Sequence, residues 1–269
     1  MTNGSEQPAE EGMAKLAIDP DVLAKELAAE LVGDPLDEIA MDDPDRDALQ
    51  AERECETALT WLNQGYEERL QGLRVFCEHR DPRAVPLLLP LLEQACPVQR
   101  MSAVYALGRN PSSPAVDPLL DLLQTDSNAY VRKATAWSLG NYAEAPVLDP
   151  LINALQTDVA AVRLWASGSL AEVGGTSATK ADAAATQLLM SLQIDSEPVV
   201  RSNCIWALGR LYESLLAPRQ QDLVEAFMTA LFHDGEASVR DEARIALEQL
   251  ENPKVAQRLQ LLIDQGLLT

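Results

Sequence analysis

VRKATAWSLG, residues 131–140, recurs as VRSNCIWALG at residues 200–209, and QRMSAVYALG at residues 99–108 follows the same template. Residues 162–171 and 239–248 match it less closely, and a degenerate earlier copy ends at Phe76. Counting back seven residues from the closing apolar residue of each copy gives an arginine every time. These arginines are Arg69, Arg100, Arg132, Arg163, Arg201 and Arg240, spaced 31, 32, 31, 38 and 39 residues apart. Self-similarity at such periods is the signature of a repeat architecture.

A second helical pattern precedes each of these copies. AVDPLLDLL at residues 115–123 and VLDPLINAL at residues 147–155 are its clearest examples. Each has a proline in the first turn, where a missing N–H costs no hydrogen bond. Two short helices cannot bury their apolar faces alone, whereas stacked pairs form a continuous core. The sequence therefore predicts an all-α, right-handed α-solenoid of about six helix-turn-helix repeats.

The repeated positions carry further expectations. An aspartate comes just before the second helix in four repeats, and these aspartates are Asp126, Asp158, Asp195 and Asp234. With the arginines they predict a hydrogen-bonded or ionic spine between repeats. Small residues three places after each arginine are expected in the core: Ala103, Thr135, Ala166, Cys204 and Ala243. The two longer spacings are attributed to loop insertions at residues 174–176 and 214–220, and Leu259, Leu261, Leu262 and Leu267 are expected to close the C-terminal end.

The charge of the chain excludes two classes of partner. The 269 residues include 42 acidic and 21 basic side chains, which gives a net charge of −21. Nucleic acids and anionic membrane surfaces both require basic residues on the protein. No apolar run is long enough to span a bilayer, no secretory signal is found, and four cysteines without a CxxC pair suit a reducing compartment. These features predict a soluble, cytoplasmic protein that binds neither nucleic acid nor membrane.

The acidity is concentrated at the front of the chain. The first 60 residues hold 17 acidic and 4 basic side chains. Residues 1–45 show no repeat and have the composition of a largely disordered segment. Within them a short helix is expected over residues 20–32, with Asp19 as N-cap and Gly33 after its last turn. This helix is expected either to dock on the solenoid or to fold on a partner. The predicted division is residues 1–45 and the solenoid 46–269.

The repeat unit V-R-x-x-A-x-W-x-L-G resembles the HEAT-like repeat of the phycobilisome bilin lyase family over about residues 60–265. Longer segments, such as LRVFCEHRDPRAV at 73–85 and YALGRNP at 105–111, resemble a cyanobacterial branch whose members interact with the A-type iron–sulfur carrier. The resemblance implies an accessory role in iron–sulfur cluster assembly. It also implies that carrier as a protein partner and Cys77, Cys96 and Cys204 as ligands. The E-type and F-type lyase subunits share the repeat, but the Tyr-Tyr-Ala-Ala-Trp-Trp-like opening of the E-type is not found.

The repeat register predicts that these three thiols lie apart. Cys77 falls at the end of one second helix and Cys96 at the opposite edge of the next repeat, about 20 Å away at 1.5 Å per residue. Cys204 falls three repeats further on, some 30 Å away at about 10 Å per helix layer. We therefore expect that the chain requires no cofactor of its own, and that an iron–sulfur cluster would be shared with a partner.

The second helices, expected to line the concave face of the solenoid, supply the candidate binding surface. Met101, Lys133, Leu164 and Trp165 come one or two positions after the repeated arginine. Contiguous apolar exposure marks contact sites, so we expect these four residues to contact a protein partner. Tyr105, Trp137 and Trp206 share a position two residues before the closing leucine and are expected in the core.

Catalytic motifs are not found. The two histidines, His79 and His233, are 154 residues apart, and neither a phosphate loop nor a nucleophile elbow occurs. Together with the resemblance, this favours a non-enzymatic protein-interaction scaffold in cyanobacterial iron–sulfur cluster assembly. The alternatives are a subunit of a phycobiliprotein bilin lyase or isomerase, and an adaptor in the assembly of photosynthetic complexes.

Overall fold

A computed structural model describes residues 44–268, with side chains from residue 48 onward. Every regular element within these residues is helical, which confirms the predicted all-α class. The chain divides into two units, residues 1–47 and 48–269. The predicted helix over residues 20–32 and nearly all of the predicted segment 1–45 lie outside the described residues, so both stay predictions.

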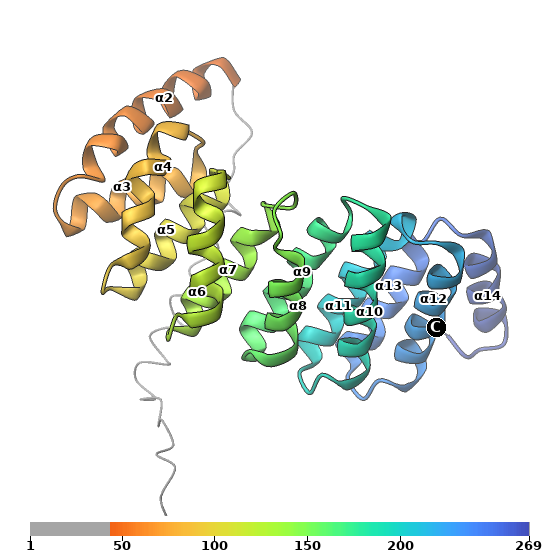
Figure 1. Ribbon diagram of the computed structural model, residues 1–269. Helices are drawn as coiled ribbons and strands as arrows, with labels where there is room; N and C mark the ends of the chain where they lie inside the picture. Colours follow the sequence, from red (N-terminus) through yellow and green to blue (C-terminus); the bar gives the residue numbers. More distant parts are fainter. Residues whose placement is uncertain (1–43, 269) are drawn as a thin grey trace, which may run out of the picture. The chain divides into compact units, whose positions relative to one another are not determined.

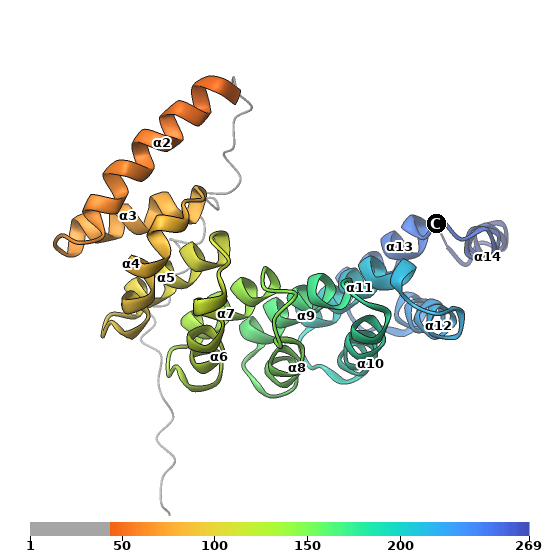
Figure 2. The ribbon, with the colours of Figure 1, turned by 45° about the horizontal axis from the view of Figure 1, so that its top comes forward.

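Helix pairs stack along the second unit, and two rows of helices result (Figures 1 and 2). The second helices of the repeats form one row: α3 (Tyr66–Glu78), α5 (Pro97–Arg109), α7 (Ala129–Gly140), α9 (Ala160–Gly174), α11 (Pro198–Leu211) and α13 (Ala237–Gln249). The first helices α6 (Val116–Thr125), α8 (Leu148–Thr157), α10 (Ala178–Ile194) and α12 (Ala217–His233) form the other row. Helix α2 (Pro44–Trp61) precedes α3, and α14 (Pro253–Asp264) follows α13. We call the surface of the row from α3 to α13 the second-helix face.

The first helix of the second repeat is broken into three pieces. A 3₁₀ turn (Pro82–Ala84), the four-residue helix α4 (Val85–Leu88) and a second 3₁₀ turn (Leu89–Glu93) replace the continuous helix of other repeats. Pro86 lies in the first turn, as expected. Pro90 has no N–H to donate to the carbonyl of residue 86, so it ends the α-helical ladder after one turn.

The two longer repeat spacings come from longer helices, so their assignment to loop insertions was wrong. Helices α10 and α12 each have 17 residues, whereas α6 and α8 each have 10. Residues 175–177 make a short connection between α9 and α10, and residues 217–220 already belong to α12. The first-helix row is therefore longer in the C-terminal half of the solenoid.

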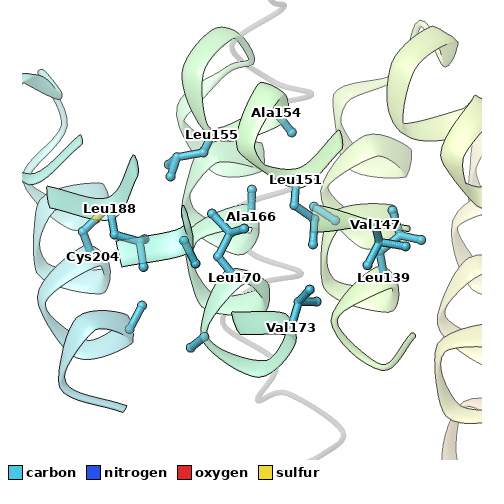
Figure 3. Close-up of a cluster of buried hydrophobic side chains, with 14 of the residues drawn as sticks. Leu139, Val147, Leu151, Ala154, Leu155, Ala166, Leu170, Val173, Leu188 and Cys204 are labelled. Atoms are coloured by element: carbon cyan, nitrogen blue, oxygen red, sulfur yellow. The ribbon is translucent and has the colours of Figure 1, made fainter. Parts of the chain in front are cut away.

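The core runs between the two rows, and the expected small-residue positions lie in it. Ala103, Thr135, Ala166, Cys204 and Ala243 are fully buried. Figure 3 shows Ala166 and Cys204 among leucines of the core, with Leu188 beside Cys204. At the C-terminal end Leu259 is buried and Leu262 partly so, but Leu261 and Leu267 are exposed because no described helix packs on the outer side of α14. None of the described helices is both long and apolar enough to span a bilayer.

Candidate functional site

Four arginines join consecutive repeats along one edge of the solenoid, as predicted. The guanidinium group of each donates two parallel hydrogen bonds, 2.7–2.9 Å long, to the carboxylate that precedes the next second helix. The pairs are Arg100–Asp126, Arg132–Asp158, Arg163–Asp195 and Arg201–Asp234. No side chain among them is more than 17% exposed. We call these four pairs the arginine–aspartate spine.

Each spine residue also bonds to the backbone. The third arginine nitrogen donates to a carbonyl in its own repeat, as Arg132 Nη1 does to Asp126 O at 2.8 Å. Each carboxylate accepts an N–H at the start of its second helix, as Asp126 does from Asn128. Desolvation is the largest influence on the Asp126 carboxyl and raises its pKa, but Arg100 and the backbone N–H together bring the pKa below its ordinary value. The charges of the spine thus neutralise one another, which indicates a structural role.

The spine is incomplete at the interface between α3 and α5, which we call the first interface. Arg69 has the expected position and its Nη2 donates to Gln64 O at 3.0 Å. Its Nε is buried and has no hydrogen-bond partner among the described residues. The residue equivalent to Asp126 is here Gln94, whose carbonyl accepts from Arg100 Nη1 at 2.8 Å. The first interface therefore has the arginine but not the carboxylate.

A hollow of about 410 Å³ opens on the second-helix face, between α7, α9 and α11. Its lining includes three tryptophans and Leu164, together with the polar residues Asn141, Glu172 and Asn203. We call it the tryptophan hollow; it is lined by Trp137, Gly140, Asn141, Leu164, Trp165, Gly168, Ser169, Glu172, Asn203 and Trp206.

The hollow arises because one repeat lacks an aromatic residue that its neighbours have. The position two residues before the closing leucine, which we call the aromatic slot, is Tyr105 in α5, Trp137 in α7 and Trp206 in α11. In α9 it is Gly168, and a tryptophan stands three residues earlier, at position 165. Residues three apart are neighbours on one helix face, so the aromatic ring of α9 is displaced by about one turn. A gap is left between Trp137 and Trp206.

The floor of the hollow depends on close helix contact. A Cβ atom on Gly140 would lie 2.8 Å from Ser169 Oγ and 3.3 Å from Ser169 Cα, so only glycine allows α7 and α9 to approach this closely. A Cβ atom on Gly168 would meet nothing nearer than Asn203 Nδ2, at 3.4 Å. Gly140 is thus required by packing, whereas Gly168 leaves space open.

The tryptophan rings are fixed by their neighbours. The rings of Tyr105 and Trp137 lie 5.3 Å apart at an angle of 57°. Lys133 Nζ lies 5.9 Å from the ring centre of Trp165, and the Arg210 guanidinium lies 5.3 Å from that of Trp206. These are cation–π distances. Arg210 also pairs with Glu172 at 3.1 Å.

The aromatic residues expected in the core are not fully buried, and one of them is exposed. Trp206 is 42% exposed, and Tyr105 and Trp137 are half-buried. The second-helix face has no third helix layer over it among the described residues, so a large ring in the aromatic slot is covered on one side only. Gly168 and Glu172 were not singled out from the sequence, although the missing aromatic residue at position 168 is visible once the repeats are aligned.

Three of the four predicted partner-binding residues lie in or beside the hollow, and Met101 does not. Leu164 and Trp165 line it, and Lys133 contacts it through the Trp165 ring. Met101 is on α5, partly buried against the core. Their role in binding stays a prediction.

The structure places the three predicted ligand cysteines in separate surroundings. Cys77, near the end of α3, donates its thiol to Ser102 O at 3.6 Å, and burial raises its pKa to about 12. Cys204 is fully buried in α11, and burial raises its pKa. Cys96 is the N-cap of α5, where backbone N–H groups and the Tyr66 hydroxyl lower its pKa. No group of three metal-ligating side chains occurs within residues 48–268, so the described residues do not fit a cluster held by this chain alone.

The chain has clear structural relatives. No curated protein matches it significantly. A designed armadillo repeat protein is 21% identical over 74% of this chain and 100% of its own length, with a TM-score of 0.54. The complex of CpcE and CpcF of phycocyanin lyase from Nostoc sp. PCC7120 matches with 26% identity and a TM-score of 0.52, over 62% of this chain and 99% of that chain.

The family follows from the repeat itself. A model of HEAT repeats matches residues 59–140 and 116–209. Together these two matches cover more than half of the sequence, and they include the spine except Asp234 and the whole lining of the tryptophan hollow. The chain belongs to the HEAT-repeat family.

Proposed function

We propose that the chain is a cytoplasmic, non-enzymatic scaffold that binds a protein partner on its second-helix face. The tryptophan hollow carries this proposal. Three tryptophan rings at one surface site give a large, rigid contact area, and tryptophan is enriched where proteins bind one another. The spine supports the same function, because it fixes the spacing of the helices that hold the rings.

The solenoid fold is suited to such a role, since stacked repeats present an extended surface. Another of the structurally similar designed armadillo proteins, with 21% identity and a TM-score of 0.56, is in complex with the peptide (KR)4. We infer that the second-helix face of this chain likewise receives a segment of another protein.

Iron–sulfur cluster assembly is the proposed process, with the A-type carrier as the proposed partner. The segments at residues 73–85 and 105–111 support it by their resemblance to that branch. Because the described cysteines do not fit a resident cluster, we propose that the chain contacts the carrier and that the carrier's own ligands hold the cluster.

Affinity capture from the cell of origin tests the scaffold. The full chain is compared with Trp206→Ala, which removes a wall of the hollow, and with Phe232→Ala, a matched control. Trp206 is 42% exposed and Phe232 40% exposed, but Phe232 lies on α12 in the first-helix row. We expect partners to be lost with Trp206→Ala and kept with Phe232→Ala. Equal capture by all three proteins would contradict the proposal.

Anaerobic reconstitution with iron and sulfide tests the cluster. We expect no cluster absorption from this chain alone, and cluster absorption in the complex when the A-type carrier is added. If the chain alone gives a cluster that Cys77→Ser, Cys96→Ser or Cys204→Ser abolishes, the chain itself holds the ligands.

A bilin lyase subunit is the second candidate, and its support is the likeness to the CpcE–CpcF complex. Co-expression with a phycobiliprotein and bilin distinguishes the two. Covalent pigment that forms only when this chain is present would replace the scaffold with the lyase.

A further inference from the structure

The proposed scaffold function does not specify the chemistry of the partner. The tryptophan hollow limits which partner side chains can bind there. Resting on that proposed function, we propose that the hollow receives one aromatic side chain of the partner. We propose further that acidic residues of the same partner segment lie over α5 and α7.

The shape of the hollow indicates an aromatic guest. The repeats on either side fill the aromatic slot with Trp137 and Trp206, and only the α9 repeat between them has glycine there. The gap of about 410 Å³ therefore lies where the repeat otherwise places an indole ring. A ring from the partner would complete the row, with Trp137 and Trp206 on its two sides. Aromatic pairs in such contact attract one another beyond the effect of the area they bury.

The charges at the hollow disfavour a cationic guest. Glu172 is the acidic residue of the lining, and it already pairs with Arg210. Lys133 and Arg210 already lie over the rings of Trp165 and Trp206. A guest lysine or arginine would meet two cations and a carboxylate that is already neutralised, whereas a neutral ring would meet no such cost.

The charges beside the hollow indicate acidic flanking residues. Helices α5 and α7 contain no aspartate or glutamate. Their spine arginines Arg100 and Arg132 are neutralised by Asp126 and Asp158. The other two basic side chains of these helices, Arg109 and Lys133, have no ion pair within the described part of the chain.

At the other end of the face α13 carries three acidic residues, Asp241, Glu242 and Glu248, against two arginines, Arg240 and Arg244. In a protein of net charge −21 the α5–α7 surface is thus a local basic region. Complementary charges fix the register of a bound segment. We therefore place the acidic part of the segment over α5 and α7 and its aromatic anchor at α9.

The chain's own front segment fits this description less well than a partner does. Residues 1–43 are acidic but contain no phenylalanine, tyrosine or tryptophan. They lack the anchor that the hollow requires.

Binding of labelled peptides to the full chain, followed by fluorescence anisotropy, tests the proposal. The probe is a fluorescein-labelled peptide with four alternating Glu and Asp residues, one Ser, one Trp and a Gly-Ser tail. Matched peptides replace the Trp by Ala or Arg, or replace the acidic run by Lys and Arg. We expect the Ala peptide to bind at least tenfold more weakly than the Trp peptide, and the basic peptide at least fivefold more weakly. Equal or tighter binding of the Arg peptide or the basic peptide overturns the proposal, as does the absence of saturable binding by the Trp peptide.

Variants of the protein locate the site. Gly168→Leu fills the hollow and Gly168→Ala leaves it open, because a Cβ atom there is at ordinary contact distance. We expect at least a tenfold loss of affinity with leucine and less than a twofold change with alanine. Circular dichroism verifies the fold, and Trp206→Ala replaces Gly168→Leu if that variant unfolds. Unchanged affinity in the folded leucine variant, or in Trp206→Ala, overturns the proposal.

Two other occupants would also overturn it. A synthetic peptide of residues 1–43 that displaces the probe would identify the chain's own segment as the guest. A dimer that Gly168→Leu dissociates would identify a second copy. If a partner is captured through Trp206 but remains bound to Gly168→Leu, the scaffold stands and the aromatic anchor fails.

Discussion

The first interface, between α3 and α5, differs from the four interfaces that follow it by one carboxylate. At the later interfaces an arginine is paired with an aspartate through two hydrogen bonds, and the aspartate also bonds to the start of its helix. At the first, Arg69 is conserved in position within the repeat, but Gln94 stands where the others have aspartate. Arg69 Nε is left buried without a partner among the described residues.

The comparison shows that the arginine and aspartate contribute unequally to the stacking. The helices stack at the first interface without the pair, so apolar burial is sufficient for the architecture. The pair adds a fixed register to that burial, because two parallel bonds define both distance and orientation. The first interface is accordingly where we expect the solenoid to be weakest.

Removing a spine carboxylate should have the largest effect. In Asp126→Ala the guanidinium of Arg100 stays largely buried without its partner, and the Asn128 N–H loses its acceptor. Breaking a buried pair from one side costs about 3–5 kcal/mol, so we expect a loss of about 3 kcal/mol or more in the free energy of unfolding. Denaturant titration measures it, with Gln94→Ala as the matched change at the first interface and an expected loss below about 0.5 kcal/mol. Similar losses at both positions would contradict the comparison.

Acid should weaken the later interfaces more than the first. The folded pKa of Asp126 is lowered from an unfolded value of about 3.9. The unfolded chain therefore binds more protons as the pH falls, and the stabilisation by this carboxylate, complete above the unfolded pKa, is lost as the pH falls through the folded one. The same direction holds for Asp158, Asp195 and Asp234.

Unfolding measured between pH 7 and pH 2 checks this expectation. Wild type should lose stability over the acidic part of that range, and Asp126→Asn should lose less because one titrating group has been removed. A parallel pH dependence in the two proteins would show that Asp126 does not contribute.

Completing the spine should stabilise the protein modestly. Gln94→Asp places a carboxylate at the position equivalent to Asp126, where Arg69 can bond to it. A charge-assisted bidentate pair that is partly exposed is expected to add about 1 kcal/mol. Thermal and denaturant unfolding measure the gain, and Arg69→Met in the Gln94→Asp background should abolish it. A gain that survives Arg69→Met would come from elsewhere.

Thiol reactivity should distinguish the cysteine at the first interface from the other cysteines. This is the smallest of the expected effects. Cys96 lies at the first interface with a lowered pKa, whereas burial raises the pKa of Cys77 and Cys204. The thiolate is the reacting form, so iodoacetamide at pH 8 should label Cys96 at least tenfold faster than the other two, as measured by mass spectrometry. In denaturant the rates should converge. Comparable rates in the folded protein would contradict the assigned environments.

Features that recur from repeat to repeat could be predicted from the sequence. Features at which one repeat differs from the others could not. The spine could be predicted because Arg132 and Asp158 have counterparts at the same spacing in neighbouring repeats. The broken helix at Pro90 depends on local backbone bonding, and the exposure of Leu261 depends on the outer side of α14 being uncovered in the described part of the chain. The hollow depends on Gly168, a residue that gives no signal on its own and acquires meaning only beside Trp137 and Trp206. Its neighbour Trp165 was predicted to contact a partner, and it lies half-buried in the lining of the hollow. Its displacement from the aromatic slot was not recognised from the sequence.

The lengths of α10 and α12 suggest a rule for how this solenoid can grow. Each has seven residues more than α6 or α8. Seven residues make close to two helical turns, with a drift of only about 20°. A helix extended by this amount keeps its apolar stripe on the core and leaves the next Asp195 or Asp234 facing its arginine. An extension by three or four residues would also return near the same face but would accumulate more rotation over two steps. Extending a first helix by seven residues would let repeats of different length stack in the same solenoid. A chimera built from a short and a long repeat should therefore assemble without redesign of their junction.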